Sequence, residues 1–105
     1  MADSPRLRQL QEFLADSPDD PELRYAVAME LLSAGATDDA VRSFRDLIAV
    51  RPAYVPTYLM LGQTLIRLDR EGEARDVLRA GVAAAKGAGN AHAEGEIQGL
   101  LDSLE

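Results

Sequence analysis

The sequence contains no cysteine, no tryptophan and only one histidine among its 105 residues. Without cysteine the chain can form neither disulfide bonds nor thiolate metal sites. His92 is the single imidazole, so the chain has no second ligand for a transition metal and no nucleophile–histidine pair. We therefore expect no catalytic activity, no metal and no cofactor.

Long apolar runs and an excess of bases are also absent. No run approaches the roughly 20 residues of a membrane span, and the N-terminus, Met-Ala-Asp-Ser-Pro, lacks the basic and then apolar pattern of a signal peptide. The chain carries 11 Lys and Arg against 18 Asp and Glu, for a net charge of -7. Because phosphates and anionic lipids bind to clustered bases, we expect no nucleic-acid or membrane partner. Cytoplasm is the expected location, and the preference for Arg over Lys is typical of a bacterial protein.

Apolar residues recur at intervals of three and four along most of the chain, which is helical spacing. Prolines and glycines separate these stretches, and a proline inside a helix would remove a hydrogen bond. There is no sustained alternation typical of strands. We expect six helices, near residues 5–15, 21–34, 38–50, 56–68, 72–86 and 91–104.

Residues at the helix ends support these boundaries. Ser4 and Asp20 each precede a proline and are expected N-caps, as is Asn90. Gly35 and Gly87 stand where a left-handed C-cap residue belongs.

The chain overlays itself when it is shifted by 34 residues. Pro18 then falls on Pro52, and Ala40 falls on Ala74. Large apolar residues and small residues follow the same period, as Leu10 with Phe44 and Leu78, Leu31 with Leu65, and Ala28 with Gly62. Small residues at the last of these positions would let the two helices of a pair cross closely.

These residues resemble the pattern of the tetratricopeptide repeat family, in which each 34-residue repeat is a pair of helices. The second copy reads Tyr58-x-x-Leu61-Gly62-x-x-Leu65, followed by Ala74 and Leu78. The first copy departs from the pattern at Arg24, where the family has an aromatic residue. The resemblance implies one all-α domain over residues 1–105, with antiparallel helix-turn-helix repeats stacked as a short right-handed α-solenoid. Its parts would be an N-terminal flanking helix at 5–15, repeats at 21–54 and 55–86, and a C-terminal capping helix at 91–104.

In this family the first helix of each repeat lines a concave face that contacts ligands. The resemblance therefore implies a non-catalytic module that binds a partner peptide or helix on this face. By register the contact residues would be Glu22, Tyr25, Met29, Leu59, Gln63, Ile66 and Arg67, with Leu32, Ser33 and Pro56 at further ligand positions. Several are apolar, where solvation alone would favour charge. The alternative is that neighbouring helices bury these apolar side chains.

Self-assembly is a second hypothesis. The helix at 5–15 corresponds to the second helix of a repeat whose first helix is missing. We expect this gap to expose Leu7, Leu10 and Phe13 on one edge, through which two copies could form a homodimer.

Overall fold

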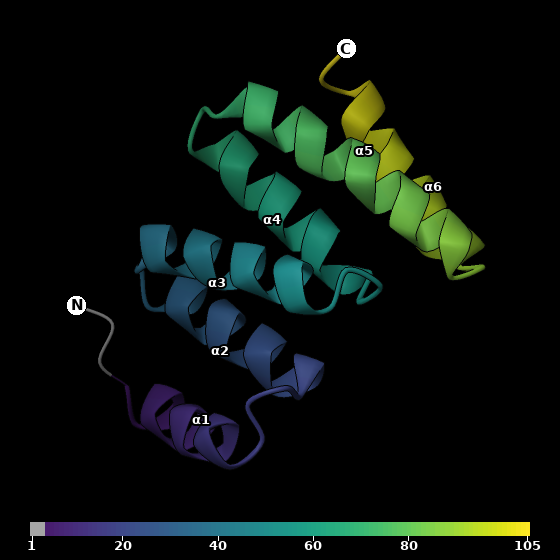
Figure 1. The fold of residues 1–105 in the computed structure, drawn as a ribbon. Helices are drawn as coiled ribbons and strands as arrows, with labels where there is room; N and C mark the ends of the chain where they lie inside the picture. Colours follow the sequence, from purple (N-terminus) through teal and green to yellow (C-terminus); the bar gives the residue numbers. More distant parts are fainter. Residues whose placement is uncertain (1–3) are drawn as a thin grey trace. The chain divides into compact units, whose positions relative to one another are not determined.

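Residues 4–105, which the computed structural model describes, form six α-helices and no strand (Figure 1). The helices are α1 (Pro5–Asp16), α2 (Pro21–Ser33), α3 (Thr37–Val50), α4 (Pro56–Arg67), α5 (Glu71–Gly87) and α6 (Ala91–Asp102). Each boundary lies within two residues of the one expected from the sequence. The predicted all-α fold, with helices packed in sequence as antiparallel pairs, is confirmed.

The chain divides into two compact units, each described here by itself. The first ends at Arg51 and contains α1, α2 and α3, with α2 packed along both of the others. The second spans Pro52–Glu105 and contains α4, α5 and α6, with α5 packed along both of its neighbours and α4 also touching α6. Completely or almost completely buried apolar side chains fill both units, namely Phe44 and Leu47 in the first and Leu61, Leu65, Leu78 and Ile97 in the second.

Three predicted N-caps are confirmed. The side chains of Ser4, Asp20 and Asn90 each accept a hydrogen bond from a backbone N–H group in the turn that follows, over 2.9, 2.9 and 3.0 Å. Each thereby satisfies a donor that the helix itself cannot pair. Helix α3 differs, since it begins at Thr37, one residue earlier than expected, and Ala36 in front of it provides no side-chain cap.

Three helices end in the same way, through a residue with positive φ. These residues are Gly35 after α2, Asp69 after α4 and Gly89 after α5, with φ of 82°, 60° and 67°. In each case the N–H group of the next residue reaches back to the carbonyl oxygen five positions earlier, as Ala36 does to Leu31, Arg70 to Leu65 and Asn90 to Ala85. This is the Schellman arrangement.

The prediction that Gly87 adopts the left-handed conformation is wrong. Gly87 is the last residue of α5, and Ala88 after it still has right-handed dihedral angles, with φ of -86° and ψ of -5°. The chain reverses only at Gly89, because from there the N–H group of Asn90 reaches the carbonyl oxygen of Ala85 over 2.9 Å.

Small residues allow the helices to cross closely, as the repeat pattern predicts. Ala28 and Ala40 are completely buried in the first unit, and Ala74 in the second. A Cβ atom on Gly62 of α4 would lie 2.5 Å from Leu78 Cδ2 of α5. Distances this short do not occur between packed side chains, so the crossing of α4 and α5 requires glycine.

Candidate functional site

In the first unit, the predicted contact residues lie on α2, on the side away from its buried stripe. Glu22 is exposed, whereas Tyr25 and Met29 are half-buried. They are spaced at i, i+3 and i+7 and so share one face of the helix. The buried residues Val27 and Leu31 lie on another face. Helix α2 therefore carries apolar side chains on two faces, only one of which is in the core.

Tyr25 lies at the boundary between core and surface. Its ring contacts the completely buried ring of Phe44 on α3, with the centroids 6.0 Å apart and the planes inclined by 57°. Such tilted contacts are favourable for aromatic pairs. One side of Tyr25 therefore stabilises the pair of α2 and α3, and the side chain keeps part of its surface exposed.

In the second unit, the predicted contact residues form one face of α4. Leu59 and Ile66 are half-buried, and Gln63 and Arg67 are exposed. Their spacing of i, i+4, i+7 and i+8 places them on one side of the helix. The core side of α4 is formed by other residues, namely Tyr58, Leu61, Gly62 and Leu65. Among the further ligand positions, Leu32 on α2 is half-buried and Ser33 and Pro56 are exposed.

Tyr58 fixes the start of α4 and thereby the orientation of this face. Its hydroxyl donates a hydrogen bond to the carbonyl oxygen of Pro52 over 2.5 Å. The side chain is only 4% exposed, and burial raises the pKa of its hydroxyl above the ordinary value of 10.0. Its Cβ packs against Gly81 of α5, where an added Cβ atom would lie 2.6 Å away. Sequence analysis missed Gly81, although it falls one period after the buried Leu47.

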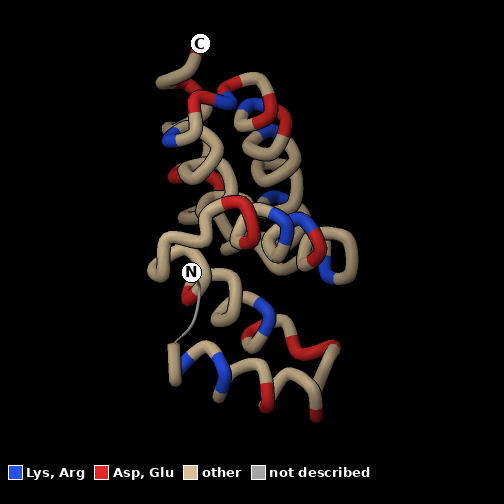
Figure 2. The backbone as a smooth tube through the Cα atoms, turned by 90° about the vertical axis from the view of Figure 1, so that its left-hand side faces the viewer, with Lys and Arg blue, Asp and Glu red and all other residues tan. Residues whose placement is uncertain are grey.

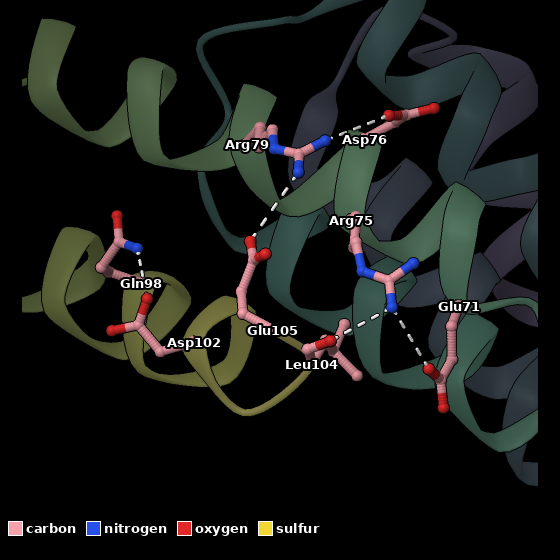
Figure 3. Close-up of polar contacts among 8 residues, drawn as sticks. All are labelled: Glu71, Arg75, Asp76, Arg79, Gln98, Asp102, Leu104 and Glu105. Atoms are coloured by element: carbon pink, nitrogen blue, oxygen red, sulfur yellow. Dashed lines mark hydrogen bonds and ion pairs between the residues drawn. The ribbon is translucent and has the colours of Figure 1, made fainter.

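Helix α6 covers α5 and does not contribute a predicted contact residue. Ile97 and Leu101 are 1% and 6% exposed. Two arginines of α5 bind the residues that follow α6 (Figure 3), since Arg75 donates a hydrogen bond to the carbonyl oxygen of Leu104 over 3.1 Å and Arg79 pairs with Glu105 over 3.7 Å. Leu101 thus packs on α5 as expected, and Leu100 is half-buried.

The expectation of an apolar N-terminal edge is largely wrong. Leu7 and Leu10 are only 3% and 8% exposed, whereas Phe13 is 50% exposed. The two leucines share the face of α1 that packs on α2, so they point into the first unit. Phe13 lies outside this face. A homodimer through this edge therefore remains a prediction with one exposed apolar side chain instead of three.

Ionisable groups form no cluster that points to chemistry. His92 is exposed, and its Nε2 lies 3.3 Å from Glu96 one turn along α6. Among residues 4–105, no group of three or more His, Asp and Glu side chains is placed to hold a metal ion. Acidic and basic residues are distributed over the surface of both units, with acids in the majority (Figure 2). Within the same range, every helix is too short or too polar to cross a membrane.

Comparison with known proteins matches residues 1–78 to the tetratricopeptide repeat family. A tetratricopeptide repeat domain protein from Salinibacter ruber, with a structure determined in solution, is 35% identical, covers 84% of this chain and 89% of its own, and superposes with a TM-score of 0.80. A protein from Bordetella parapertussis is 25% identical, with coverage of 97% and 89% and a TM-score of 0.80.

The MamA protein of Desulfovibrio magneticus, at 24% identity and a TM-score of 0.69, shows the same fold over 94% of this chain and 64% of its own. No curated protein sequence matches. Tetratricopeptide repeat domains generally serve as protein-interaction modules and are typically non-catalytic.

Proposed function

This chain belongs to the tetratricopeptide repeat family, and from that premise we propose that it is a non-catalytic module that binds a segment of another protein. The segment, a peptide or a helix, contacts the faces of α2 and α4 that line the concave side in this family. In the first unit these are Glu22, Tyr25 and Met29, and in the second they are Leu59, Gln63, Ile66 and Arg67. The cytoplasmic location expected from the sequence is part of the proposal.

The observation that carries the proposal is the incomplete burial of apolar side chains on these two faces. Met29 on α2 and Leu59 and Ile66 on α4 are half-buried, although each lies outside the buried stripe of its helix. Covering such side chains contributes about 25 cal/mol for each Å² removed from water. A partner segment with apolar side chains would gain this free energy.

The polar residues on the same faces define the kind of segment. Gln63 can donate and accept hydrogen bonds, and Arg67 lies one turn beyond it on the same face of α4. Neither α2 nor α4 has the Lys and Asn side chains with which related domains bind a terminal carboxylate. We therefore propose that recognition rests on apolar contacts with polar anchors, and that a free C-terminus is not required.

The test compares partner capture by the intact chain and by a variant with Met29→Gln and Leu59→Gln. Both side chains are half-buried, so the substitutions preserve size and add polar groups to the proposed surface. Tyr25 is left unchanged because its ring also contacts Phe44. We expect the variant to keep its helical circular dichroism spectrum and to lose the captured partner.

The matched control is the pair Phe13→Ser and Val50→Ser, which removes the large exposed apolar side chains elsewhere, at 50% and 47% exposure. This control should retain the same partner. A folded Met29→Gln and Leu59→Gln variant that captures the partner as well as the intact chain does would refute the proposed surface.

A further inference from the structure

Phe13 on α1 occupies a repeat position that is buried in both other copies. One period of 34 residues later the position is Leu47 on α3, which is completely buried, and two periods later it is Gly81 on α5. In the second unit a first helix covers this position, since Tyr58 of α4 packs against Gly81. Helix α1 has no such first helix, and Phe13 is 50% exposed.

Two contacts show which side of α1 carries Phe13. Arg6 of α1 pairs with Glu30 of α2 over 3.3 Å, and the Ser4 hydroxyl donates to the same carboxylate over 3.5 Å. Phe13 lies seven residues after Arg6 and therefore on the same side of α1. Because α1 and α2 are antiparallel, the residues of α2 opposite Phe13 lie seven positions before Glu30, around Leu23.

The open side of this junction includes both apolar and acidic residues. Leu23 and Ala26 on α2 are half-buried. Asp16 is one turn beyond Phe13 on α1, and Asp19 and Glu22 follow in the loop and at the start of α2. All three acids are exposed, and none of their side chains forms an ion pair within residues 4–105. In Figure 2 the bases of α1 lie in its first half and the acids in its second half and in the following loop.

We propose that Phe13 and the adjoining edge of α2 form a docking seat for an amphipathic helix of another protein, one that carries Lys or Arg beside its apolar face. The helix takes the place on α1 that α4 takes on α5. Its bases lie near Asp16, Asp19 and Glu22, which are acidic and unpaired. A second copy of this chain is disfavoured as the occupant, because each copy carries a net charge of -7.

The seat also determines the size of the residue that lies over Phe13. In the second unit the position holds Gly81, and the covering helix supplies the large side chain of Tyr58. At the seat the volume is already supplied by Phe13. A close approach therefore requires a small residue, Ala or Gly, at the middle of the docking helix, with larger apolar residues one turn away on either side.

This seat is separate from the surface of the proposed function, which uses Tyr25 and Met29 in the same unit. The experiment uses two synthetic peptides of roughly 18 residues, long enough to be partly helical. Both contain Ala at the centre of a Leu-based apolar face. One carries Lys beside that face, and the other carries Glu at the same positions. Binding to the isotopically labelled full chain is followed by NMR chemical-shift changes.

We expect the Lys peptide to bind, to shift the amide signals of residues 9–26, and to weaken as salt is raised. Phe13→Ser should reduce its affinity about tenfold, which is typical of losing a central apolar anchor. The matched control is Val50→Ser, which removes the other large exposed apolar side chain and should leave the affinity unchanged. Because Phe13 is exposed, the variant should fold, and its NMR spectrum reports this directly.

Several outcomes would overturn the seat. These are equal affinity for the Glu and Lys peptides, unchanged affinity of a folded Phe13→Ser variant, shifts confined to residues outside 9–26, or no binding of the Lys peptide. A concentration-dependent dimer of the chain alone that Phe13→Ser dissociates would also overturn it, because the occupant would then be a second copy. None of these results bears on Met29 and Leu59, so the proposed function is tested independently.

Discussion

Gly62 and Leu78 lie so close together that a Cβ atom on the glycine would come within 2.5 Å of Leu78 Cδ2 and within 2.9 Å of Leu78 Cγ. Leu78 is completely buried and has no space into which it can move. We predict that Gly62→Ala lowers the free energy of unfolding by about 1–2 kcal/mol, since overpacking outweighs the gain of about 1 kcal/mol in helix propensity. Urea denaturation followed by circular dichroism measures this, and an unchanged or increased stability would contradict it.

Gly95 and Gly99 of α6 should respond in the opposite direction. A Cβ atom at either position would meet no atom within 4 Å, and both residues are exposed. Replacing each with alanine should raise the stability of α6 by about 0.5–1 kcal/mol, because glycine loses more backbone entropy in a helix.

The sequence predicts that α6 is the least stable helix, on account of these two glycines. Hydrogen exchange should therefore show that the amides of α6 are the least protected of the six helices in the intact chain. The double variant Gly95→Ala and Gly99→Ala should slow that exchange. If α6 is already as protected as α5 in the intact chain, the prediction is wrong.

Asp69 offers a stabilising substitution at the end of α4. It is the only non-glycine residue with positive φ in the described part of the chain, at 60°, and Gly35 occupies the equivalent position one repeat earlier. We predict that Asp69→Gly raises the free energy of unfolding by about 0.5–1 kcal/mol, because the left-handed region is strained for residues with a Cβ atom. The reciprocal substitution, Gly35→Ala, should destabilise the first unit by about 1 kcal/mol. Thermal unfolding of both variants tests the pair, and stabilisation by Gly35→Ala would contradict it.

Tyr58 should make stability depend on alkaline pH. Burial raises the pKa of its hydroxyl in the folded state above 10.0, the value in the unfolded chain. The folded state therefore retains a proton that the unfolded state loses. This stabilisation is fully present below pH 10 and disappears as the pH rises through the folded pKa.

Tyr58→Phe is the matched variant, because it removes only the hydroxyl and its hydrogen bond to Pro52. At neutral pH we expect it to be less stable by about 1 kcal/mol. Above pH 10 the difference between the two proteins should shrink. Urea denaturation at a series of pH values provides the measurement, and a constant or growing difference would count against a raised pKa.

The helix positions could be predicted because their signals are local. Ser4, Asp20 and Asn90 cap helices through neighbouring backbone groups, and the apolar spacing marks one face of each helix. Gly81 could not be predicted in the same way, because the reason for its small size is Tyr58, on another helix 23 residues earlier. Gly87 misled for a similar reason, since the end of α5 depends on which carbonyl group the following N–H groups reach.

The candidate site was only partly predictable. Register identifies which face of a helix a residue shares, and so it placed Leu59, Gln63 and Ile66 together on α4. It does not show how far a neighbouring helix covers that face. For the same reason Leu7 and Leu10 were expected at an open edge, whereas α2 covers them and leaves Phe13 exposed.

The way in which α6 is attached to α5 has a consequence for concentrated brine. Its main contacts are the apolar side chains Ile97 and Leu101 and the hydrogen bond from Arg75 to an uncharged backbone oxygen of Leu104. Dissolved ions screen exposed charge pairs such as Arg79 with Glu105, but they do not weaken apolar contacts. The C-terminal helix should therefore stay docked at ionic strengths that remove most of the attraction between surface charges.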